Sequence, residues 1–179
     1  MLAQFDQTIL LAIQATNRPW MDNFSRIVSR LAASPWFWGA LVGLGFLVSF
    51  RVMKRAFWPL VVALALELVV VESLIKPFVQ RSRPFWVLPT VRTIDPVFTS
   101  FSFPSGHAAA TSAAAWVLGF YFPKLRLLLV VGVILVAASR VYNGDHWPSD
   151  VLAGLVIGSF FGWLTLRILA MIASRRENL

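Results

Sequence analysis

The sequence of 179 residues contains no cysteine and few charged residues. Without cysteine, disulfide bonds and thiolate chemistry are excluded. Charged residues make up 13% of the chain, whereas soluble domains carry about 25%. Hydrophobic residues reach 58%, and the mean hydropathy is +0.73. A soluble core could not bury this much apolar surface, so the composition indicates that lipid surrounds much of the chain.

Acidic residues are also scarce, with eight Asp and Glu against sixteen Lys and Arg and a net charge of +8. The basic residues stand between apolar runs, which favours anionic lipid headgroups as partners and argues against nucleic acid. The first residues do not resemble a cleaved signal peptide, because they lack a basic start and polar residues interrupt the apolar run. These polar residues are Gln4, Asp6, Gln7 and Gln14.

The apolar pattern predicts an all-α fold, a polytopic transmembrane helical bundle that forms one domain over residues 1–179. Several apolar stretches approach the roughly 20 residues that a membrane span requires. In residues 1–35, apolar residues recur at helical spacing, and polar residues such as Arg26 and Arg30 take the other face. This pattern predicts two amphipathic helices at the membrane interface, of which the first is an alternative sixth span. The five apolar stretches are residues 35–50, 57–75, 105–122, 125–138 and 149–173.

The loops between these stretches predict an orientation. With five spans, the basic turns at residues 51–55 and 124–126 and the basic pair at 175–176 lie on one side, which the positive-inside rule makes cytoplasmic. Eight Lys and Arg lie on the other side against seven on this one. The assignment therefore requires that the eight basic residues on the other side either take part in a reaction or lie on lipid headgroups. We expect a multi-pass protein of the plasma or inner membrane, with its site on the extracytoplasmic side.

Three polar clusters lie at span ends on this second side, where they can converge although they are separated in sequence. Lysine and arginine side chains in them supply donors for phosphate oxygens, and the planar fork of arginine suits phosphate particularly well. Ser105 and Gly106 stand where a loop enters an apolar helix, so exposed amide groups there face an anion. The clusters predict a phosphate site. They are Lys76 to Arg83-Pro84, Pro104-Ser105-Gly106-His107, and Ser139-Arg140 followed by His146 and Asp150.

Both histidines of the chain, His107 and His146, belong to these clusters. If the last helix begins near Trp147, Asp150 lies one turn beyond His146 and can accept a hydrogen bond from one ring nitrogen. The other nitrogen is then free to attack phosphorus. His107 can protonate the leaving oxygen. The clusters therefore provide a nucleophile, an orienting carboxylate and a general acid.

The three clusters resemble the signature of the type 2 phosphatidic acid phosphatase superfamily, membrane lipid phosphatases related to vanadium haloperoxidases. That signature reads Lys-x6-Arg-Pro, then Pro-Ser-Gly-His, then Ser-Arg-x5-His-x3-Asp, and residues 76–150 match every element in order. The resemblance implies a phosphohistidine at His146, orientation of that ring by Asp150 and a general acid at His107. It also implies that no metal or other cofactor is needed, and carboxylates for a cation site are scarce here. The phosphate-binding residues that it implies are Lys76, Arg83, Ser105, Gly106 and Arg140.

The signature residues contact phosphate rather than the rest of a lipid, so the substrate stays open. Small members of the superfamily resemble undecaprenyl diphosphate phosphatases, and this lipid is our first expectation. Phosphatidylglycerophosphate, phosphatidic acid and lipid A phosphates are alternatives. A flippase is disfavoured because the charges gather at one membrane face, and a lipid-binding structural subunit leaves the His-Asp spacing unexplained. We expect the loop from Phe85 to Ser102 to shape the entrance.

Other charged residues near the clusters allow more than one interpretation. Glu72 lies four residues before Lys76, so one helical turn can pair them and steady the lysine. Arg81 and Arg92 are interpreted chiefly as headgroup contacts. Asp145 is either a solvated loop residue or a group that tunes the neighbouring histidine.

A stripe of small residues marks the last apolar stretch. Gly154, Gly158 and Gly162 repeat every four residues, which places them on one helix face. We expect this face to pack closely against another helix of the same chain rather than to form a dimer seam. The sequence indicates no oligomeric state.

Overall fold

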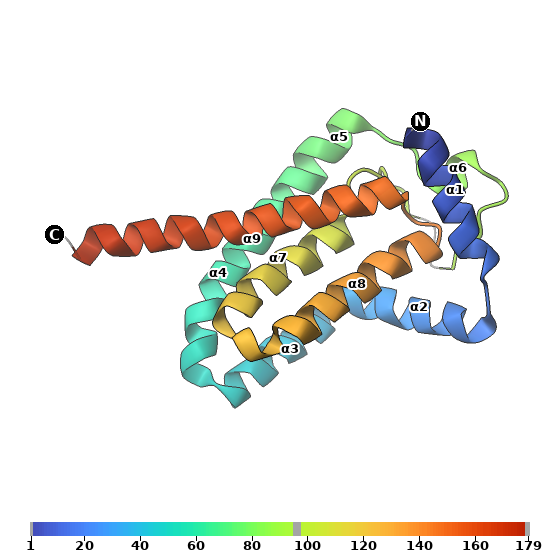
Figure 1. Ribbon diagram of the computed structural model, residues 1–179. Coiled ribbons are helices and arrows are strands. Elements are labelled where there is room, and N and C mark those ends of the chain that lie inside the picture. The colour runs from blue at the N-terminus through green and yellow to red at the C-terminus, as the bar shows by residue number, and fades with distance from the viewer. Residues whose placement is uncertain (1, 95–97, 178–179) are drawn as a thin grey trace.

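The computed structural model describes residues 2–94 and 98–177, and within these ranges it contains helices and no strands (Figure 1). The all-α prediction is therefore confirmed. Two short segments depart from α-helical geometry: the π-helix η1 (Val69–Ile75) and the 3₁₀-helix η2 (Pro123–Leu125). The α-helices are α1 (Leu2–Ala15), α2 (Pro19–Ala33), α3 (Pro35–Val48), α4 (Phe50–Leu68), α5 (Lys76–Val79), α6 (Pro84–Val87), α7 (Gly106–Tyr121), α8 (Arg126–Tyr142) and α9 (Pro148–Glu177).

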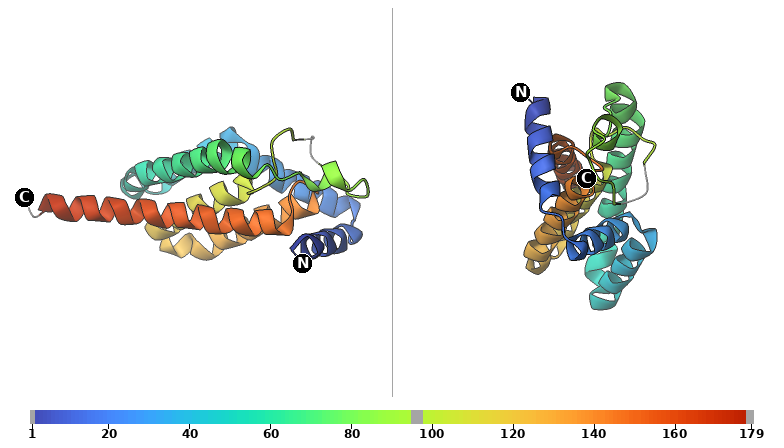
Figure 2. Two further views of the ribbon diagram at one scale, coloured as in Figure 1. Left: turned by 90° about the horizontal axis from the view of Figure 1, so that it is seen from above. Right: turned by 90° about the vertical axis from the view of Figure 1, so that its right-hand side faces the viewer.

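Helix α7 lies at the centre of the bundle, packed against α4, α8 and α9 (Figures 1 and 2). Its first ten residues, GHAAATSAAA, are mostly small, which allows the neighbouring helices to approach closely. The glycine stripe of α9, formed by Gly154, Gly158 and Gly162, faces α7. A methyl group on any of these glycines would overlap atoms of α7 or of Ser105, the residue that precedes α7. The glycine stripe thus packs within the chain, as predicted.

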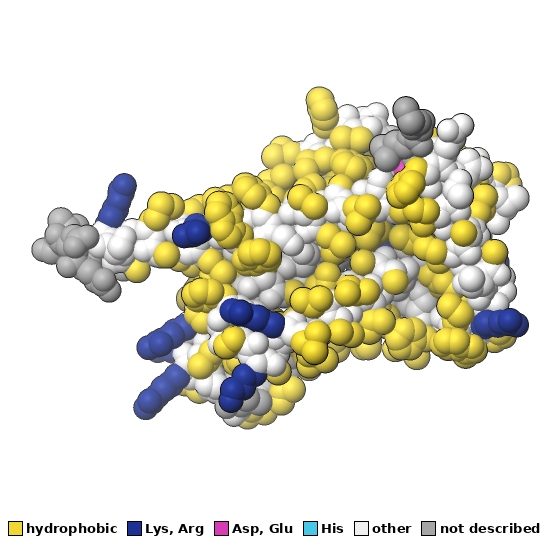
Figure 3. All heavy atoms as spheres, viewed as in Figure 1, with side chains coloured by type: hydrophobic (Ala, Val, Ile, Leu, Met, Phe, Trp, Pro, Cys, Tyr) yellow, Lys and Arg dark blue, Asp and Glu magenta, His cyan; other side chains and the backbone are white. Residues whose placement is uncertain are grey.

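Polar and apolar side chains are distributed in the reverse of a soluble protein. The largest fully buried side chains include Arg83, Arg140 and His146, whereas Trp36, Leu47 and many other large apolar side chains are exposed. Figure 3 shows hydrophobic side chains along the bundle and a concentration of Lys and Arg at the end that carries the α3–α4 and α7–α8 turns. This distribution is expected of a protein whose surroundings are lipid.

Within the described residues, three helical stretches are long and apolar enough to cross a membrane: Phe50–Val87, Pro123–Tyr142 and Pro148–Arg175. A fourth crossing results if Pro19–Ala33 and Pro35–Leu47, which meet at an angle of 70°, form one broken span. Helix α7, with 16 residues, is shorter than these stretches. The chain is therefore a multi-pass membrane protein, and the count of five to six spans stays a prediction.

The N-terminal segment forms helices α1 and α2, and α2 turns its polar face inward. Ser25 and Ser29 of α2 are buried, whereas Phe24 and Ile27 are about half exposed. The Ser25 hydroxyl donates to the side-chain oxygen of Asn143 over 2.6 Å. The side of α2 that carries Ser25 and Ser29 therefore packs against the end of α8, whereas Phe24 and Ile27 are exposed. Its predicted position at the membrane interface stays a prediction.

Candidate active site

A cavity of about 340 Å³ lies where α4–η1–α5, the start of α7 and the α8–α9 connection meet. The described part of the chain contains no group of three or more His, Asp or Glu side chains placed to hold a metal ion. Metal independence stays a prediction. All three sequence clusters contribute to the cavity wall, and its lining includes Glu72, Lys76, Arg83, Gly106, His107, Arg140 and His146.

The three cations of the cavity are held by partners, although their side chains are almost completely buried. The Lys76 ammonium lies 2.6 Å from a carboxylate oxygen of Glu72, so the expected pair one helical turn apart is present. Arg140 pairs with Asp145 at 2.8 Å, and both side chains are 1% exposed. The alternative in which Asp145 is a solvated loop acid is therefore wrong. Pairing offsets the high cost of burying each charge.

The Arg83 guanidinium is fixed by the loop before α7. Its Nε donates to the Ser100 carbonyl over 2.7 Å and its Nη2 to the Ser100 hydroxyl over 3.0 Å. Its Nη1 donates to the Asp145 carbonyl over 2.9 Å. The Phe98 ring lies 4.8 Å from this guanidinium and 5.1 Å from that of Arg140. The described part of the expected entrance loop therefore borders the cations, whereas residues 95–97 lie outside the described residues.

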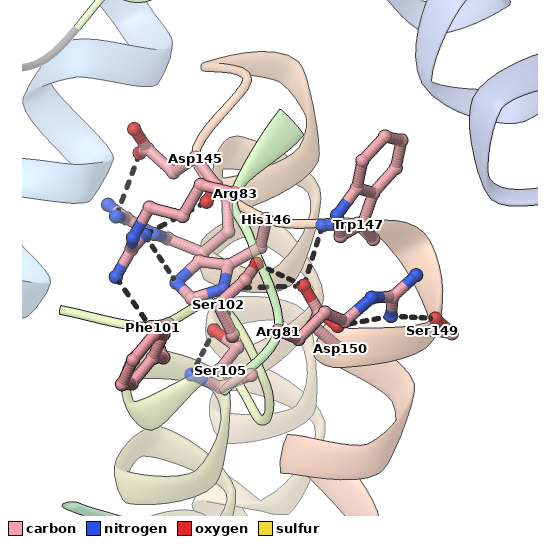
Figure 4. A network of polar contacts seen from close by, with 12 residues as sticks. Arg81, Arg83, Phe101, Ser102, Ser105, Asp145, His146, Trp147, Ser149 and Asp150 are labelled. Atoms are coloured by element: carbon pink, nitrogen blue, oxygen red, sulfur yellow. Dashed lines mark hydrogen bonds and ion pairs between the residues drawn. The ribbon is translucent and has the colours of Figure 1, made fainter. Parts of the chain in front are cut away.

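The tautomer of His146 follows from its hydrogen bonds (Figure 4). Nδ1 lies 2.8 Å from the Ser102 carbonyl oxygen. A carbonyl can only accept, so Nδ1 carries the proton, and in the neutral ring Nε2 is unprotonated. Nε2 lies 3.3 Å from Nη1 of Arg83, beside the cavity. The arrangement leaves Nε2 as the nitrogen that can attack.

Asp150 does not accept the direct hydrogen bond that we expected from His146. Its Oδ2 lies 3.8 Å from Nδ1, beyond hydrogen-bond range. The same oxygen accepts from the Ser102 hydroxyl and, over 3.0 Å, from the Trp147 amide. The carboxylate is therefore linked to the histidine through Ser102, a residue that the sequence clusters did not include, and its orienting role stays a prediction.

His146 is held in its neutral form. Burial lowers the pKa of His146 to about 3, and the nearby Asp150 carboxylate opposes this shift without cancelling it. Arg83 and Arg140 lower the pKa further, because their charges disfavour a second cation close by. A neutral imidazole with an unprotonated nitrogen beside a cationic cavity has the character of a nucleophile.

The residues of the second cluster, at the start of α7, have two different positions: some line the cavity, and Ser105 lies outside its wall. Gly106 and His107, the first residues of α7, line the cavity, so the amino-terminal end of this helix forms part of its wall. Ser105 is fully buried, and its side chain caps α7 by accepting from the Ala108 amide over 3.5 Å. Its own amide donates to the Asp150 carbonyl over 3.0 Å. Ser105 is not part of the described cavity wall, and it ties α7 to α9.

A tight turn explains the spacing between Arg140 and His146. The amides of Asp145 and His146 both donate to the Arg140 carbonyl over 3.2 Å, so the chain folds back at once beyond α8. Gly144 has φ of +77°, which a residue with a side chain rarely adopts. This turn places the arginine and the histidine on the same cavity.

Arg81 and Arg92 form ion pairs within the chain, and their interpretation as headgroup contacts stays a prediction. Arg81 pairs with Asp6 at 2.6 Å and with Asp150 at 2.5 Å. Arg92 pairs with Asp22 at 3.1 Å. An acidic residue within an apolar helix is costly unless it is paired, so Asp6 could have been recognised from the sequence. No comparable signal points to Ser102.

Comparison with known proteins agrees with this geometry. The sequence profile of the PAP2 superfamily matches residues 56–173, which include all three clusters, and the chain belongs to this superfamily. The undecaprenyl-diphosphatase of Sulfolobus acidocaldarius is 34% identical over 68% of this chain, a match that spans 59% of that protein. The decaprenylphosphoryl-5-phosphoribose phosphatase of Mycobacterium tuberculosis is 33% identical over 86% of this chain and 85% of its own. The crystal structure of Aquifex aeolicus LpxE superposes with a TM-score of 0.78 at 29% identity, over 90% of this chain and 94% of its own.

Proposed function

We propose that the protein is an integral membrane lipid phosphatase that hydrolyses a phosphomonoester or diphosphate headgroup without a metal ion. One observation carries the proposal: Nε2 of a neutral His146 lies at a cavity whose wall also contains Lys76, Arg83 and Arg140. Three cations around a small cavity suit the oxygens of one phosphoryl group. The unprotonated nitrogen beside them can attack its phosphorus.

The proposed reaction has two steps. Nε2 of His146 attacks the terminal phosphorus, and a P–N bond forms while the P–O bond to the leaving group breaks. The leaving group is the lipid alcohol for a phosphomonoester and the lipid monophosphate for a diphosphate. His107 gives its proton to the leaving oxygen. Water then attacks the phosphohistidine and loses a proton to His107 as the P–N bond breaks and inorganic phosphate leaves. Lys76, Arg83, Arg140 and the amides at the start of α7 stabilise the charge on phosphorus in both steps.

We propose undecaprenyl diphosphate as the first substrate to test. The names of the two relatives described above point to long isoprenoid lipids, which supports this choice. Phosphatidylglycerophosphate, phosphatidic acid and lipid A phosphates share the phosphate chemistry and are the alternatives.

We further propose that the site opens on the extracytoplasmic side of the plasma or inner membrane. Lys76, Arg83 and Arg140 are buried in the cavity, so they do not count as free charges at that end. The opposite end carries exposed basic residues, which the positive-inside rule places in the cytoplasm. In this topology α3, α4–α5, α7, α8 and α9 cross the membrane, and α1 and α2 lie at the outer interface. The exposed basic residues are Arg51, Lys54, Arg55, Lys124, Arg126, Arg167 and Arg175.

The test is phosphate release by the purified protein in detergent with EDTA. Wild type and His146→Ala are compared on undecaprenyl diphosphate, phosphatidylglycerophosphate, phosphatidic acid and lipid A. We expect metal-independent release by wild type and loss of release in the variant, and the fastest lipid identifies the substrate class. Release that requires an added metal, or full activity in His146→Ala, contradicts the mechanism.

A further inference from the structure

Arg81 stands outside the catalytic cavity, behind Asp150, and bridges two buried carboxylates. Its Nη1 donates to Asp150 Oδ1 over 2.5 Å and to the Ser149 hydroxyl over 2.7 Å. Its Nη2 donates to Asp6 Oδ2 over 2.6 Å. The guanidinium also lies 5.4 Å from the Trp147 ring. Figure 4 shows Arg81 and Asp150 on the side of His146 opposite Arg83.

Two routes lead from Arg81 to the ring of His146. The first passes through side chains: Asp150, fixed by Arg81, accepts from the Ser102 hydroxyl, and the Ser102 carbonyl accepts from Nδ1 of His146. The second passes through the main chain, because the Ser102 amide donates to the Arg81 carbonyl over 2.8 Å. Both routes end on Ser102, whose carbonyl sets the tautomer of the histidine.

Asp6 links the N-terminal helix to the same network. Its side chain is fully buried in the contact between α1 and the start of α9. Besides the Arg81 guanidinium, it accepts from the amide and the hydroxyl of Ser149 over 2.9 and 2.6 Å. A carboxylate at the first turn of α9 is favoured by the helix dipole. Asp6 therefore holds both Arg81 and the helix end that carries Asp150.

We propose that Arg81 is a positioning residue for His146 and that Asp6 of α1 keeps Arg81 in place. The inference rests on the proposed function and adds α1 to the machinery of the site. A guanidinium reaches both carboxylates at once through its two Nη atoms, whereas a lysine ammonium is a single point charge. Without Arg81, the carboxylates of Asp6 and Asp150 lose the cation between them, and Asp150 no longer holds Ser102 in one place.

The kinetic test compares Arg81→Lys, Asp6→Asn and their double variant with wild type. Arg92→Lys is the matched control, because Arg92 also pairs with an aspartate, but that partner is Asp22, whereas Arg81 pairs with Asp150. We expect kcat to fall about 10- to 100-fold in Arg81→Lys, the range found when the hydrogen-bond partners that orient metal-bound histidines are changed. KM should change by less than about twofold, because the phosphate-binding cations are untouched. The double variant should lose less than the product of the single losses, because both changes break the same chain.

Rates are expressed per folded enzyme, measured by thermal unfolding and size-exclusion chromatography of each variant. A wild-type kcat in Arg81→Lys overturns the inference. Equal losses in Arg81→Lys and Arg92→Lys also overturn it, because they would indicate a general effect of weakening an ion pair.

A spectroscopic test separates this inference from the proposed function. Protein labelled with ¹⁵N-histidine gives ring signals for only two residues, since the chain contains two histidines. We expect the Nδ1–H signal of His146 to shift in Arg81→Lys and Asp6→Asn and to stay unchanged in Arg92→Lys. This result supports the positioning role even if wild type releases no phosphate from any lipid, an outcome that would count against the proposed function alone. Identical His146 signals in all four proteins overturn the inference.

Discussion

The chemistry of the cavity depends on which nitrogen of His146 carries the proton. The Ser102 carbonyl fixes that proton on Nδ1, and burial keeps the ring neutral, so Nε2 keeps a lone pair, which faces Nη1 of Arg83 and the cavity. A charged ring would lack this lone pair and would add a fourth cation beside Lys76, Arg83 and Arg140. The neutral state is therefore required for the proposed attack.

We expect His146 to resist protonation well below the ordinary range of histidine. Because burial lowers its pKa to about 3, the ring should stay neutral from about pH 8 down to about pH 5, where an ordinary histidine with a pKa of about 6.5 becomes charged. The measurement is a ¹⁵N titration of the His107→Ala variant, in which His146 is the only histidine. A titration midpoint near the ordinary value would contradict the assigned environment.

The sequence predicted the individual site residues better than their connections. Spacing and residue type were sufficient to select Lys76, Arg83, His107, Arg140 and His146, because short motifs specify which groups lie on one helix end or loop. The link through Ser102 was not predictable, since it depends on how the loop before α7 folds over the α8–α9 turn. The expected direct bond from His146 to Asp150 assumed a helical arrangement, whereas His146 precedes α9 and lies in the turn.

At the scale of elements, the contact between α7 and α9 sets the geometry of the site. His107 begins α7 and Asp150 lies in the first turn of α9, so a shift between these helices moves both residues. Gly158 faces the backbone of Ala109 with no room for a side chain. The close packing of these two helices therefore fixes the positions of His107 and Asp150 relative to each other.

Gly158→Ala should destabilise the bundle. The added methyl group overlaps main-chain atoms of α7, and overpacking of this kind costs about 1–3 kcal/mol. We expect the Tm in detergent to fall by about 2–4 °C for each kcal/mol lost. Gly39→Ala in α3 is the control, because nothing lies within 4 Å of its added methyl group. Equal melting temperatures for the two variants would refute the packing argument.

For helix α2, the sequence pattern predicts the helix but not the face that packs against the rest of the protein. Apolar and polar residues at helical spacing predicted a helix in this segment, and α2 is one. In a soluble protein the apolar face would be buried. Here the polar face is inside, where the Ser29 hydroxyl accepts from Arg140 and Asp22 accepts from the Tyr142 hydroxyl over 2.6 Å.

For the whole molecule, burial of the cavity cations resolves the near tie in basic residues between the two ends. The positive-inside rule concerns charges in loops near the membrane ends, and the arginines enclosed in the cavity are not such charges. The exposed basic residues then leave a clear excess at the end opposite the cavity. The sequence could not show this difference, because it does not reveal which arginines are buried.

The absence of native cysteine allows a direct test of orientation. Arg18 is exposed near the cavity end, and Lys124 is exposed in the α7–α8 turn at the other end. In intact cells, we expect a membrane-impermeant maleimide to label Arg18→Cys and to label Lys124→Cys only after the membrane is made permeable. The reverse pattern would place the cavity in the cytoplasm.

The central claim is that phosphate passes through a covalent bond to His146. The most direct measurement is to quench the enzyme in alkali during turnover of a lipid with a radiolabelled phosphate and to locate the label by peptide mapping, since a phosphohistidine survives alkali and is lost in acid. We predict label on the peptide that contains His146 in wild type, with EDTA present, and no label in His146→Ala. Label on another residue, or turnover that continues in His146→Ala, would contradict the account.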